Sequence, residues 1–308
     1  MTTAPASPPH DDDITIATCN VEKNGFGNPD LRRAAYALLR EHNVDLIFRQ
    51  EMFKATEAQH AVMYEAERAL GMRGWLGSGP TNNPTAVFAN TDLFRPLGNW
   101  PAPWDGFKMP PTAVTLQLRD AGPDSTPIIA VAAHLNYASY ALREIEAGWI
   151  TYFNDKTVTL PNGQTRHARM LAGLDGNSYP TTTPGVADIR LPELDKIPDL
   201  PHRAHRSRPG PDSTRVMDQE PHKLLHTGGC RDIALHLART VHRPLAPTML
   251  ACDTHGPDAR VDWLLSSPEL LPAFHSVTTV DTQHLSDHNL VIARANRGAL
   301  ARLLSATE

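Results

Sequence analysis

The apolar residues of this chain fall into short continuous runs and into longer runs with helical spacing. The continuous runs predict buried strands at Ile14–Val21, Val44–Phe48, Pro84–Ala89, Ala113–Leu118, Ile128–Ala133, Met170–Ala172, Val261–Leu265 and Leu290–Ile292. Apolar residues three and four apart predict helices at Leu31–Glu41, Glu57–Leu70, Ala138–Phe153, Gly229–His236 and Ala299–Leu304. A chain of 308 residues with this mixture can form one large α/β domain or two smaller ones.

Polar side chains accompany the ends of these predicted strands. Such residues follow a strand at Asn20, Glu51, His134, Asp175 and Asn177, interrupt one at Asp262, and precede one at Asp287 and His288. Open α/β sheets bind their ligands beyond the ends of the strands. The pattern therefore predicts one polar site where the strand ends meet.

The segment Leu171–Pro180 is the centre of this pattern. Side chains two residues apart in an extended segment point the same way, so Asp175 and Asn177 are presented side by side. A carboxylate next to a carboxamide suits a site that orients a water molecule and holds a developing oxyanion. Taken alone, the sequence Asp-Gly-Asn-Ser is also favourable turn chemistry.

The other polar positions each have two interpretations. Glu51, at the tip of an apolar strand, is a candidate ligand of a hard cation such as Mg²⁺ or an exposed loop residue. Asn20 is a neutral oxygen ligand or a turn cap. His134 is a phosphate donor or acid, or a histidine that is merely hydrogen-bonded at a strand end.

Two further residues are candidates for substrate binding. Asn136 lies two residues after His134 and shares its face. Arg143 lies near the start of the helix predicted at Ala138–Phe153, where it could face the site or pair with Glu146.

Composition narrows the possible partners. The net charge of −5 is not that of a protein that coats duplex nucleic acid with a basic face, although a bound metal could supply local positive charge at a phosphate site. No run of about 18 apolar residues predicts a membrane span, and the first residues do not resemble a secretory signal. Cys19, Cys230 and Cys252 have no metal-binding spacing, so we expect reduced, buried thiols in a cytoplasmic protein.

Two stretches lack a clear period. Residues 179–229 are rich in Pro, Arg and His and predict a long loop or lid, which could collect an anionic substrate or be a solvated insertion. The stretch Trp100–Pro111 predicts an ordered loop whose aromatic residues could stack on a base or, as we favour, pack onto the sheet. No Gly-rich phosphate loop, HExxH helix or GxSxG elbow is present.

Six short motifs occur in a specific order: CNVEKNG, FRQE, AAHLN, GLDGNS, RVDWL and LSDHNLV. In this order the chain resembles the endonuclease/exonuclease/phosphatase superfamily, the deoxyribonuclease-I-like phosphoesterases, over about residues 12–295. The resemblance implies a four-layer α/β/β/α sandwich of two mixed sheets flanked by helices. We accordingly expect a disordered tail at 1–12, one domain at 13–298 with the irregular insertion at 179–229, and a C-terminal tail at 299–308.

The resemblance also implies roles for the site residues. Glu51 would bind Mg²⁺ or Mn²⁺ with Asn20 beside it, and Asp287 would complete the metal side. Asp175 would orient or deprotonate the attacking water, while Asn177 would hold a phosphoryl oxygen. Asp262 would orient His288, and His288 and His134 would contact the phosphate in the transition state.

The substrate is less constrained than the reaction. Gly176 stands where the family often has an aromatic residue, and Cys19 stands where many members have an aromatic residue before the Asn. We expect a metal-dependent phosphodiesterase of nuclease type. A phosphatase or diesterase of a small molecule (a nucleotide, sugar phosphate or lipid headgroup) is the second hypothesis, and a catalytically silent binding module of the same fold is the third.

Overall fold

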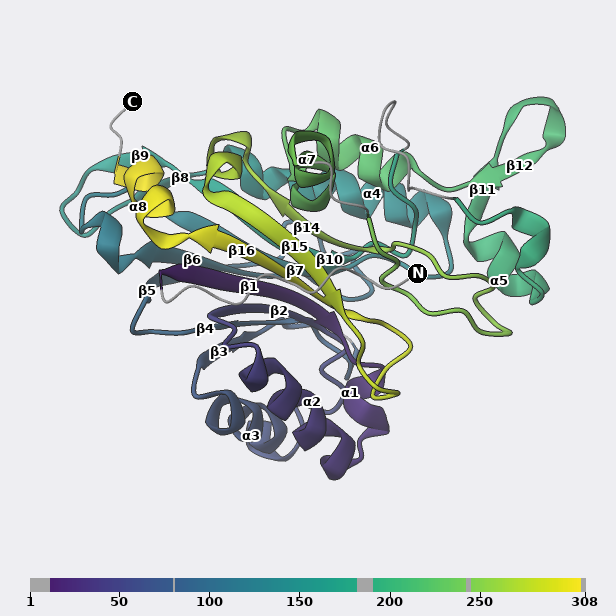
Figure 1. Cartoon of the computed structure of the whole chain (residues 1–308), viewed down its shortest axis with the longest axis horizontal. Coiled ribbons are helices and arrows are strands. Elements are labelled where there is room, and N and C mark those ends of the chain that lie inside the picture. The colour runs from purple at the N-terminus through teal and green to yellow at the C-terminus, as the bar shows by residue number, and fades with distance from the viewer. Residues whose placement is uncertain (1–11, 80, 182–190, 242–244, 306–308) are drawn as a thin grey trace.

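The computed structural model describes residues 12–79, 81–181, 191–241 and 245–305, so the tail predicted at 1–12 lies almost wholly outside the described residues. Two six-stranded sheets stack face to face, and helices cover both outer faces (Figure 1). The predicted four-layer sandwich is confirmed.

The first sheet contains the N-terminal and C-terminal strands of the fold. Its strand order is β15 (Phe274–Val280), β16 (Leu290–Asn296), β1 (Asp13–Asn20), β2 (Leu46–Gln50), β4 (Ala86–Ala89) and β3 (Arg73–Leu76). Only β1 and β2 run parallel; the other neighbours are antiparallel. Because β1 and β2 run parallel, their C-terminal ends lie at the same end of the sheet.

The second sheet repeats this plan. Its strand order is β13 (Arg231–Asp232), β14 (Asp262–Ser266), β10 (Arg169–Asp175), β7 (Ile128–His134), β6 (Thr112–Leu118) and β5 (Phe94–Trp100). Here β7 and β10 form the parallel pair. Two small hairpins lie outside the sheets: β8 (Thr157–Thr159) with β9 (Thr165–His167), and β11 (Ser207–Pro209) with β12 (Arg215–Met217).

Buried strands divide their side chains between two cores. On β7, Ile128 and Ala130 pack between the sheets, whereas Ile129 and Val131 pack under the helices of the second sheet. Successive strand residues point to opposite faces, so a strand covered on both sides must be apolar throughout. This requirement explains why the central strands read as continuous apolar runs.

Eight helices accompany the sheets among the described residues: α1 (Lys23–Phe26), α2 (Pro29–Glu41), α3 (Ala61–Leu70), α4 (Tyr140–Ile150), α5 (Leu200–His205), α6 (Glu220–Thr227), α7 (Ile233–Thr240) and α8 (Arg297–Ser305). Short 3₁₀ helices lie at Ala58–His60, Arg119–Ala121, Thr151–Asp155, Leu194–Lys196, Pro211–Ser213 and Pro268–Ala273. Helices α2 and α3 pack on the first sheet, and α4 and α6 pack on the second (Figure 1). Within the described ranges, no helix combines the length and apolar character that crossing a bilayer requires.

Several expectations are corrected. The segment 299–308 is not a tail up to residue 305, because Leu300 and Leu304 of α8 are buried in the core between the sheets. Strands β3, β5 and β15 were not predicted, and β13 lies at the start of the segment Gly229–His236, which was predicted as a helix. Cys252 is exposed, unlike the buried Cys19 and Cys230. The stretch Trp100–Pro111 packs as favoured, with its aromatic residues against the core of the second sheet.

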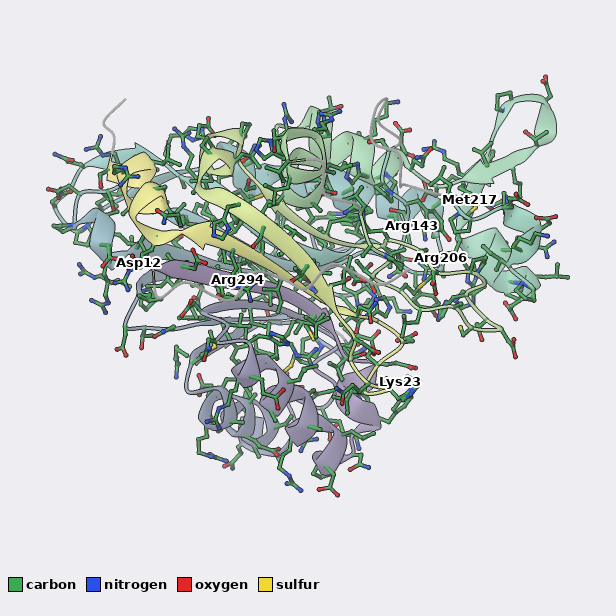
Figure 2. The ribbon with its side chains drawn as sticks, viewed as in Figure 1. Asp12, Lys23, Arg143, Arg206, Met217 and Arg294 are labelled. Carbon is green, nitrogen blue, oxygen red and sulfur yellow. The ribbon has the colours of Figure 1, made fainter. Side chains whose placement is uncertain are left out.

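The insertion predicted as irregular is substantially folded. Its described part, 179–181 and 191–229, contains α5, the β11–β12 hairpin and α6. Figure 2 shows Arg206 and Met217, at the two ends of this hairpin, on the same side of the molecule as Arg143 of α4. The insertion is therefore folded, and it extends the helical layer that covers the second sheet.

Candidate active site

Three predicted residues lie in register on neighbouring strands of the second sheet. Asp175, the last residue of β10, is paired with His134 at the end of β7 and with Asp262 at the start of β14. Residues directly opposite each other on adjacent strands have neighbouring side chains on one face. All three side chains are buried, with exposed fractions of 5% or less. The strand register thus places two aspartates and a histidine side by side at one end of the second sheet.

The first sheet contributes Asn20 to the same place. Asn20 Nδ2 donates a hydrogen bond to Asp175 Oδ2 at 2.9 Å, which joins residues 155 positions apart in the chain. Asn20 is also the backbone partner of Gln50 on β2, so Glu51 begins the loop beside it. Stacking of the two sheets therefore unites both predicted halves of the site.

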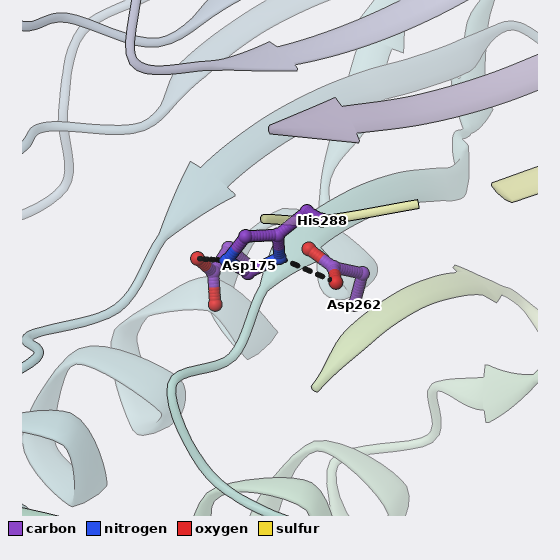
Figure 3. Close-up of side chains that lie close together, drawn as sticks. All are labelled: Asp175, Asp262 and His288. Atoms are coloured by element: carbon purple, nitrogen blue, oxygen red, sulfur yellow. Dashed lines mark hydrogen bonds and ion pairs between the residues drawn. The ribbon is translucent and has the colours of Figure 1, made fainter. Parts of the chain in front are cut away.

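His288 completes the cluster from the loop before β16. Its Nδ1 atom lies 2.8 Å from Asp262 Oδ2, and its Nε2 atom lies 3.8 Å from Asp175 Oδ2 (Figure 3). His134 approaches the same oxygen of Asp175, with Nε2 at 3.4 Å. Two imidazole rings therefore flank the Asp175 carboxylate, and one of them is fixed by a second carboxylate.

The carboxylates determine the charge of His288. Burial alone would lower the pKa of its imidazole, but the negative charges of Asp262 and Asp175 outweigh burial and raise the pKa to about 10. His288 is therefore an imidazolium at neutral pH. Its Nδ1 proton is directed to Asp262, so its Nε2 proton is available to an acceptor in the site.

The two aspartates respond differently to burial. Burial would raise the pKa of Asp175, yet the neighbouring His134, His288 and Arg206 lower it. For Asp262 burial dominates and, with help from the charge of Asp175, raises the pKa despite the bond to His288. Asp175 therefore loses its proton more readily than Asp262, and Asp262 is the orienting partner of His288.

Asn177 is held tightly beside Asp175. Its backbone N–H donates to Asp175 Oδ1 at 2.9 Å, and its Nδ2 donates to the carbonyl of Leu135 at 2.9 Å. The carboxamide carries two N–H groups, so one remains for a phosphoryl oxygen. Between them, a Cβ on Gly176 would lie 2.4 Å from the ring of Trp263, which explains why no aromatic residue occupies position 176.

Two residues of the predicted metal side, Glu51 and Asp287, interact with Glu22, and we call these three residues the acidic edge. Burial and the charges of Asp287 and Glu51 raise the pKa of Glu22, so the three carboxylates interact electrostatically. Next to this edge, Asn20 Oδ1 is buried and has no hydrogen-bond partner among the described residues. An orphaned neutral oxygen and neighbouring carboxylates are the oxygen donors that Mg²⁺ and Mn²⁺ prefer.

A second group could also hold a cation, because ligand atoms of Asp175, Asp262 and His288 lie within 4.8 Å of one another. A cation at His288 Nδ1 would have to replace the 2.8 Å bond to Asp262. At the acidic edge, Glu51 Oε2 already accepts from the backbone N–H of Lys23 at 2.7 Å and Asp287 lies 3.3 Å from His255, whereas Asn20 Oδ1 has no partner among the described residues. Both groups are therefore candidate cation sites, and Asn20 Oδ1 is the oxygen among them without an internal partner.

The structure corrects the interpretation of Arg143. The side chain is fully buried, and its guanidinium donates to Asp218 at 2.8 Å and to the carbonyls of Asn136, Tyr137 and His205. With these donors engaged, Arg143 ties α4 to the insertion and has no free donor for the predicted substrate contact. The helix position predicted in sequence could not reveal this burial.

Asn136 also has an internal role. Its Oδ1 accepts hydrogen bonds from the backbone N–H groups of Ala138 and Ser139, both at 3.0 Å, and so shapes the turn before α4. Its own N–H donates to Glu146 Oε2 at 2.5 Å. Asn136 therefore positions the loop after His134. Because its side-chain oxygen has internal partners, the predicted substrate contact stays a prediction for its Nδ2 atom only.

Two residues near the site were missed. Ser286 Oγ accepts from the backbone N–H of His288 at 3.2 Å and donates to the carbonyl of Asn20 at 2.9 Å, which links the metal side to the histidine. Its position in the motif LSDHNLV could have identified it. Arg206 lies close enough to Asp175 to lower its pKa, but no sequence period distinguished it within the insertion.

Neither a model of a known protein family nor a curated protein matches the sequence. Solved structures match it over nearly its whole length. The endonuclease/exonuclease/phosphatase from Bacteroides vulgatus has a TM-score of 0.61 and 14% identity and covers 92% of this chain and 98% of its own. D. rerio TDP2 complexed with single strand DNA product has a TM-score of 0.58 and 12% identity, covering 92% and 99%. A Bacteroides thetaiotaomicron mannosyl-6-phosphatase has a TM-score of 0.55 and 14% identity, covering 91% and 98%.

At these identities the likeness establishes the fold. The chain has the fold of the endonuclease/exonuclease/phosphatase superfamily, as the order of its motifs predicted. The neighbours include a protein bound to single-stranded DNA and a sugar phosphatase, so the fold is shared by proteins with different substrates.

Proposed function

We propose that this protein is a metal-dependent phosphoesterase that hydrolyses phosphodiester bonds. The observation that carries the proposal is the buried arrangement of Asp175 between His134 and the Asp262-bound His288, joined to Asn20 across the two sheets. A buried ionised carboxylate beside an imidazolium and next to unsatisfied oxygen ligands is costly for a merely structural core. It suits a reaction in which water attacks an anionic phosphate.

In this proposal the protein residues divide the proton transfers. Asp175, ionised at neutral pH, accepts a hydrogen bond from the attacking water and orients it. His288 is already protonated, so it cannot act as the resting base; its Nε2–H donates to a phosphoryl oxygen. The free N–H of Asn177 and the ring of His134 provide further donors at the developing charge.

Asn20, Glu51, Glu22 and Asp287 would hold the cation, Mg²⁺ or Mn²⁺. When bound, such an ion neutralises phosphate charge that otherwise repels the attacking oxygen. Its fit to this chain rests on the partnerless Asn20 Oδ1 and the interacting carboxylates of the acidic edge.

A diester substrate of nucleic-acid type is favoured by TDP2, whose solved complex contains single strand DNA product. A small phosphorylated molecule is the second candidate, because a mannosyl-6-phosphatase has the same fold. The insertion favours a single strand or a small molecule over a duplex, since α5 and the β11–β12 hairpin extend beside the site.

The test is an assay of the full chain with Mg²⁺ or Mn²⁺ on four substrates: bis-p-nitrophenyl phosphate, p-nitrophenyl phosphate, single-stranded DNA and double-stranded DNA. We expect turnover of the diester and of single-stranded DNA that EDTA abolishes. Turnover of the monoester alone would favour the small-molecule phosphatase. No EDTA-sensitive turnover of any phosphorylated compound would contradict the proposal and favour a silent binding module.

A further inference from the structure

One buried guanidinium near the site has two nitrogen atoms without a hydrogen-bond partner in the described part of the chain. Arg206 follows α5 and is only 3% exposed, yet Nε and Nη1 of its guanidinium have no hydrogen-bond partner there. Its Nη2 has only a weak contact, at 3.7 Å, with the sulfur of Met249. Buried donors without hydrogen-bond partners are unfavourable, so a partner from outside the protein would relieve this cost.

Arg143 shows that a buried guanidinium in this part of the molecule can be fully hydrogen-bonded. Arg143 is equally buried, but its guanidinium contacts the carboxylate of Asp218 and three carbonyl oxygens. Arg206 lies within the insertion and Arg143 contacts it, and Figure 2 shows both on the same side of the molecule. The protein therefore satisfies one of these buried cations and leaves the other with free donors.

Arg206 is fixed in this position by its backbone. Its N–H donates to the carbonyl of His202 at 2.9 Å, and its carbonyl accepts from the N–H of Asp218 at 3.1 Å. Both the end of α5 and the segment after β12 therefore hold the residue. Because the backbone of Arg206 is held on both sides, the residue is preorganised to bind a ligand.

The free donors lie near the catalytic carboxylate. The charge of Arg206 is among the causes that lower the pKa of Asp175, and it also opposes the rise that burial imposes on the pKa of Tyr179. The Tyr179 hydroxyl is itself buried and without a partner among the described residues. The contacts agree: Arg206 contacts Met249, whose backbone is bridged to His288, and the backbone of Asp218 is bonded to both Arg206 and Tyr179. Two unsatisfied donors, one of them cationic, therefore belong to residues held next to the segment that carries His288.

We propose that Arg206, assisted by the Tyr179 hydroxyl, binds a phosphate oxyanion of the substrate. A guanidinium offers parallel N–H donors that match two oxygens of a phosphate. The oxyanion is either that of the scissile phosphate or that of a second phosphate next to it. The inference rests on the proposed function and assigns the insertion a part in substrate binding.

The first test measures binding without turnover. The melting temperature of the full chain is recorded with increasing inorganic phosphate and with chloride at the same ionic strength. We expect phosphate to stabilise the wild type and Arg294→Met, and to stabilise Arg206→Met with an apparent Kd about tenfold or more higher. Arg294 is a matched control because it is also a buried arginine, on β16, away from Arg206 in Figure 2.

The same variant gives a second, independent signature. Without phosphate, Arg206→Met should melt at the same temperature as the wild type or higher, because it removes buried donors without hydrogen-bond partners. A clear drop in that melting temperature would show that the guanidinium has a structural partner and would overturn the inference. An unchanged phosphate dependence in Arg206→Met, or none in the wild type, would overturn it as well.

Activity distinguishes the two sources of the oxyanion. If Arg206 holds the scissile phosphate, Arg206→Met lowers kcat/KM equally for dithymidine monophosphate and for the same dinucleotide with a 5′-phosphate. If Arg206 holds a neighbouring phosphate, only the 5′-phosphorylated substrate is affected. Phosphate binding through Arg206 by a protein without any turnover would contradict the proposed function and leave this inference standing.

Discussion

His288 illustrates how the site depends on individual contacts. Its ring is bonded to Asp262 on one side and faces Asp175 on the other, so both its orientation and its charge are fixed by carboxylates. Asn20 differs, because its amide nitrogen is bonded to Asp175 while its oxygen is orphaned. At the scale of single residues, the site thus contains satisfied groups that hold it and unsatisfied groups that await a ligand.

Replacing Glu51 by Gln tests the metal side. The substitution removes one negative charge from the acidic edge and keeps the shape of the side chain. We expect turnover at fixed Mg²⁺ to fall on the order of a hundredfold or more, with an unchanged melting temperature. Glu57→Gln is a control because Glu57 is exposed. Wild-type turnover in Glu51→Gln would show that Glu51 does not bind the cation.

Glu146 provides a prediction about pH. Burial raises the pKa of its carboxyl from 4.5 to about 7, despite hydrogen bonds from Asn136 and Lys108. Ionising it in the folded state therefore lowers the free energy of unfolding progressively as pH rises from about 5 to 7. Glu146→Gln removes this penalty, so its stability relative to wild type should rise by on the order of 1–3 kcal/mol between pH 5 and pH 8. Urea unfolding at both pH values measures the difference, and a pH-independent difference would contradict the assignment.

At the scale of elements, the insertion is attached through buried polar contacts. The Arg143–Asp218 pair joins α4 to the segment after β12, and Arg143 also donates to the carbonyl of His205 at the end of α5. The hairpin β11–β12 lies between these two attachment points in sequence. The position of the insertion, and of Arg206 within it, therefore depends on Arg143.

Arg143→Met should destabilise the protein, in contrast to Arg206→Met. It leaves the Asp218 carboxylate buried without its counter-charge, a change that costs about 3–5 kcal/mol in comparable buried pairs. We expect a lower melting temperature and faster proteolytic cleavage within residues 191–229. If Arg143→Met and Arg206→Met had equal effects on stability, the distinction between a satisfied and an unsatisfied arginine would be wrong.

At the scale of the whole molecule, each sheet combines strands that are far apart in sequence. Helix α8 closes one end of the sandwich, and its Leu300 and Leu304 belong to the core between the sheets. Leu304→Ala should lower the free energy of unfolding by about 2–5 kcal/mol. Arg302→Ala, on the exposed side of the same helix, should change it little. An unaffected melting temperature in Leu304→Ala would mean that residues 299–305 are a tail after all.

The central architecture was predictable from the sequence, because strands buried on both faces must be apolar and the polar residues at their ends stand out against them. Three edge strands were not, because they lack a continuous apolar run: β3 contains Arg73 and Gly74, β5 contains Pro96 and Gly98, and β15 contains His275 and Ser276. Residues whose role depends on burial in irregular segments, such as Arg206, carry no periodic signal. The ion pair of Arg143 was not predictable either, because its partner Asp218 lies 75 residues away.

The central claim is that His288, Asp262 and Asp175 form a phosphoesterase site, and His288→Ala tests it most directly. His275→Ala is the matched control, since His275 lies 2.9 Å from Asp13 in another His–Asp pair, which is on the first sheet and whose histidine is exposed. With bis-p-nitrophenyl phosphate and Mn²⁺, the account predicts EDTA-sensitive turnover that falls on the order of a hundredfold or more in His288→Ala and stays at the wild-type level in His275→Ala. Wild-type turnover in a folded His288→Ala protein would contradict the account.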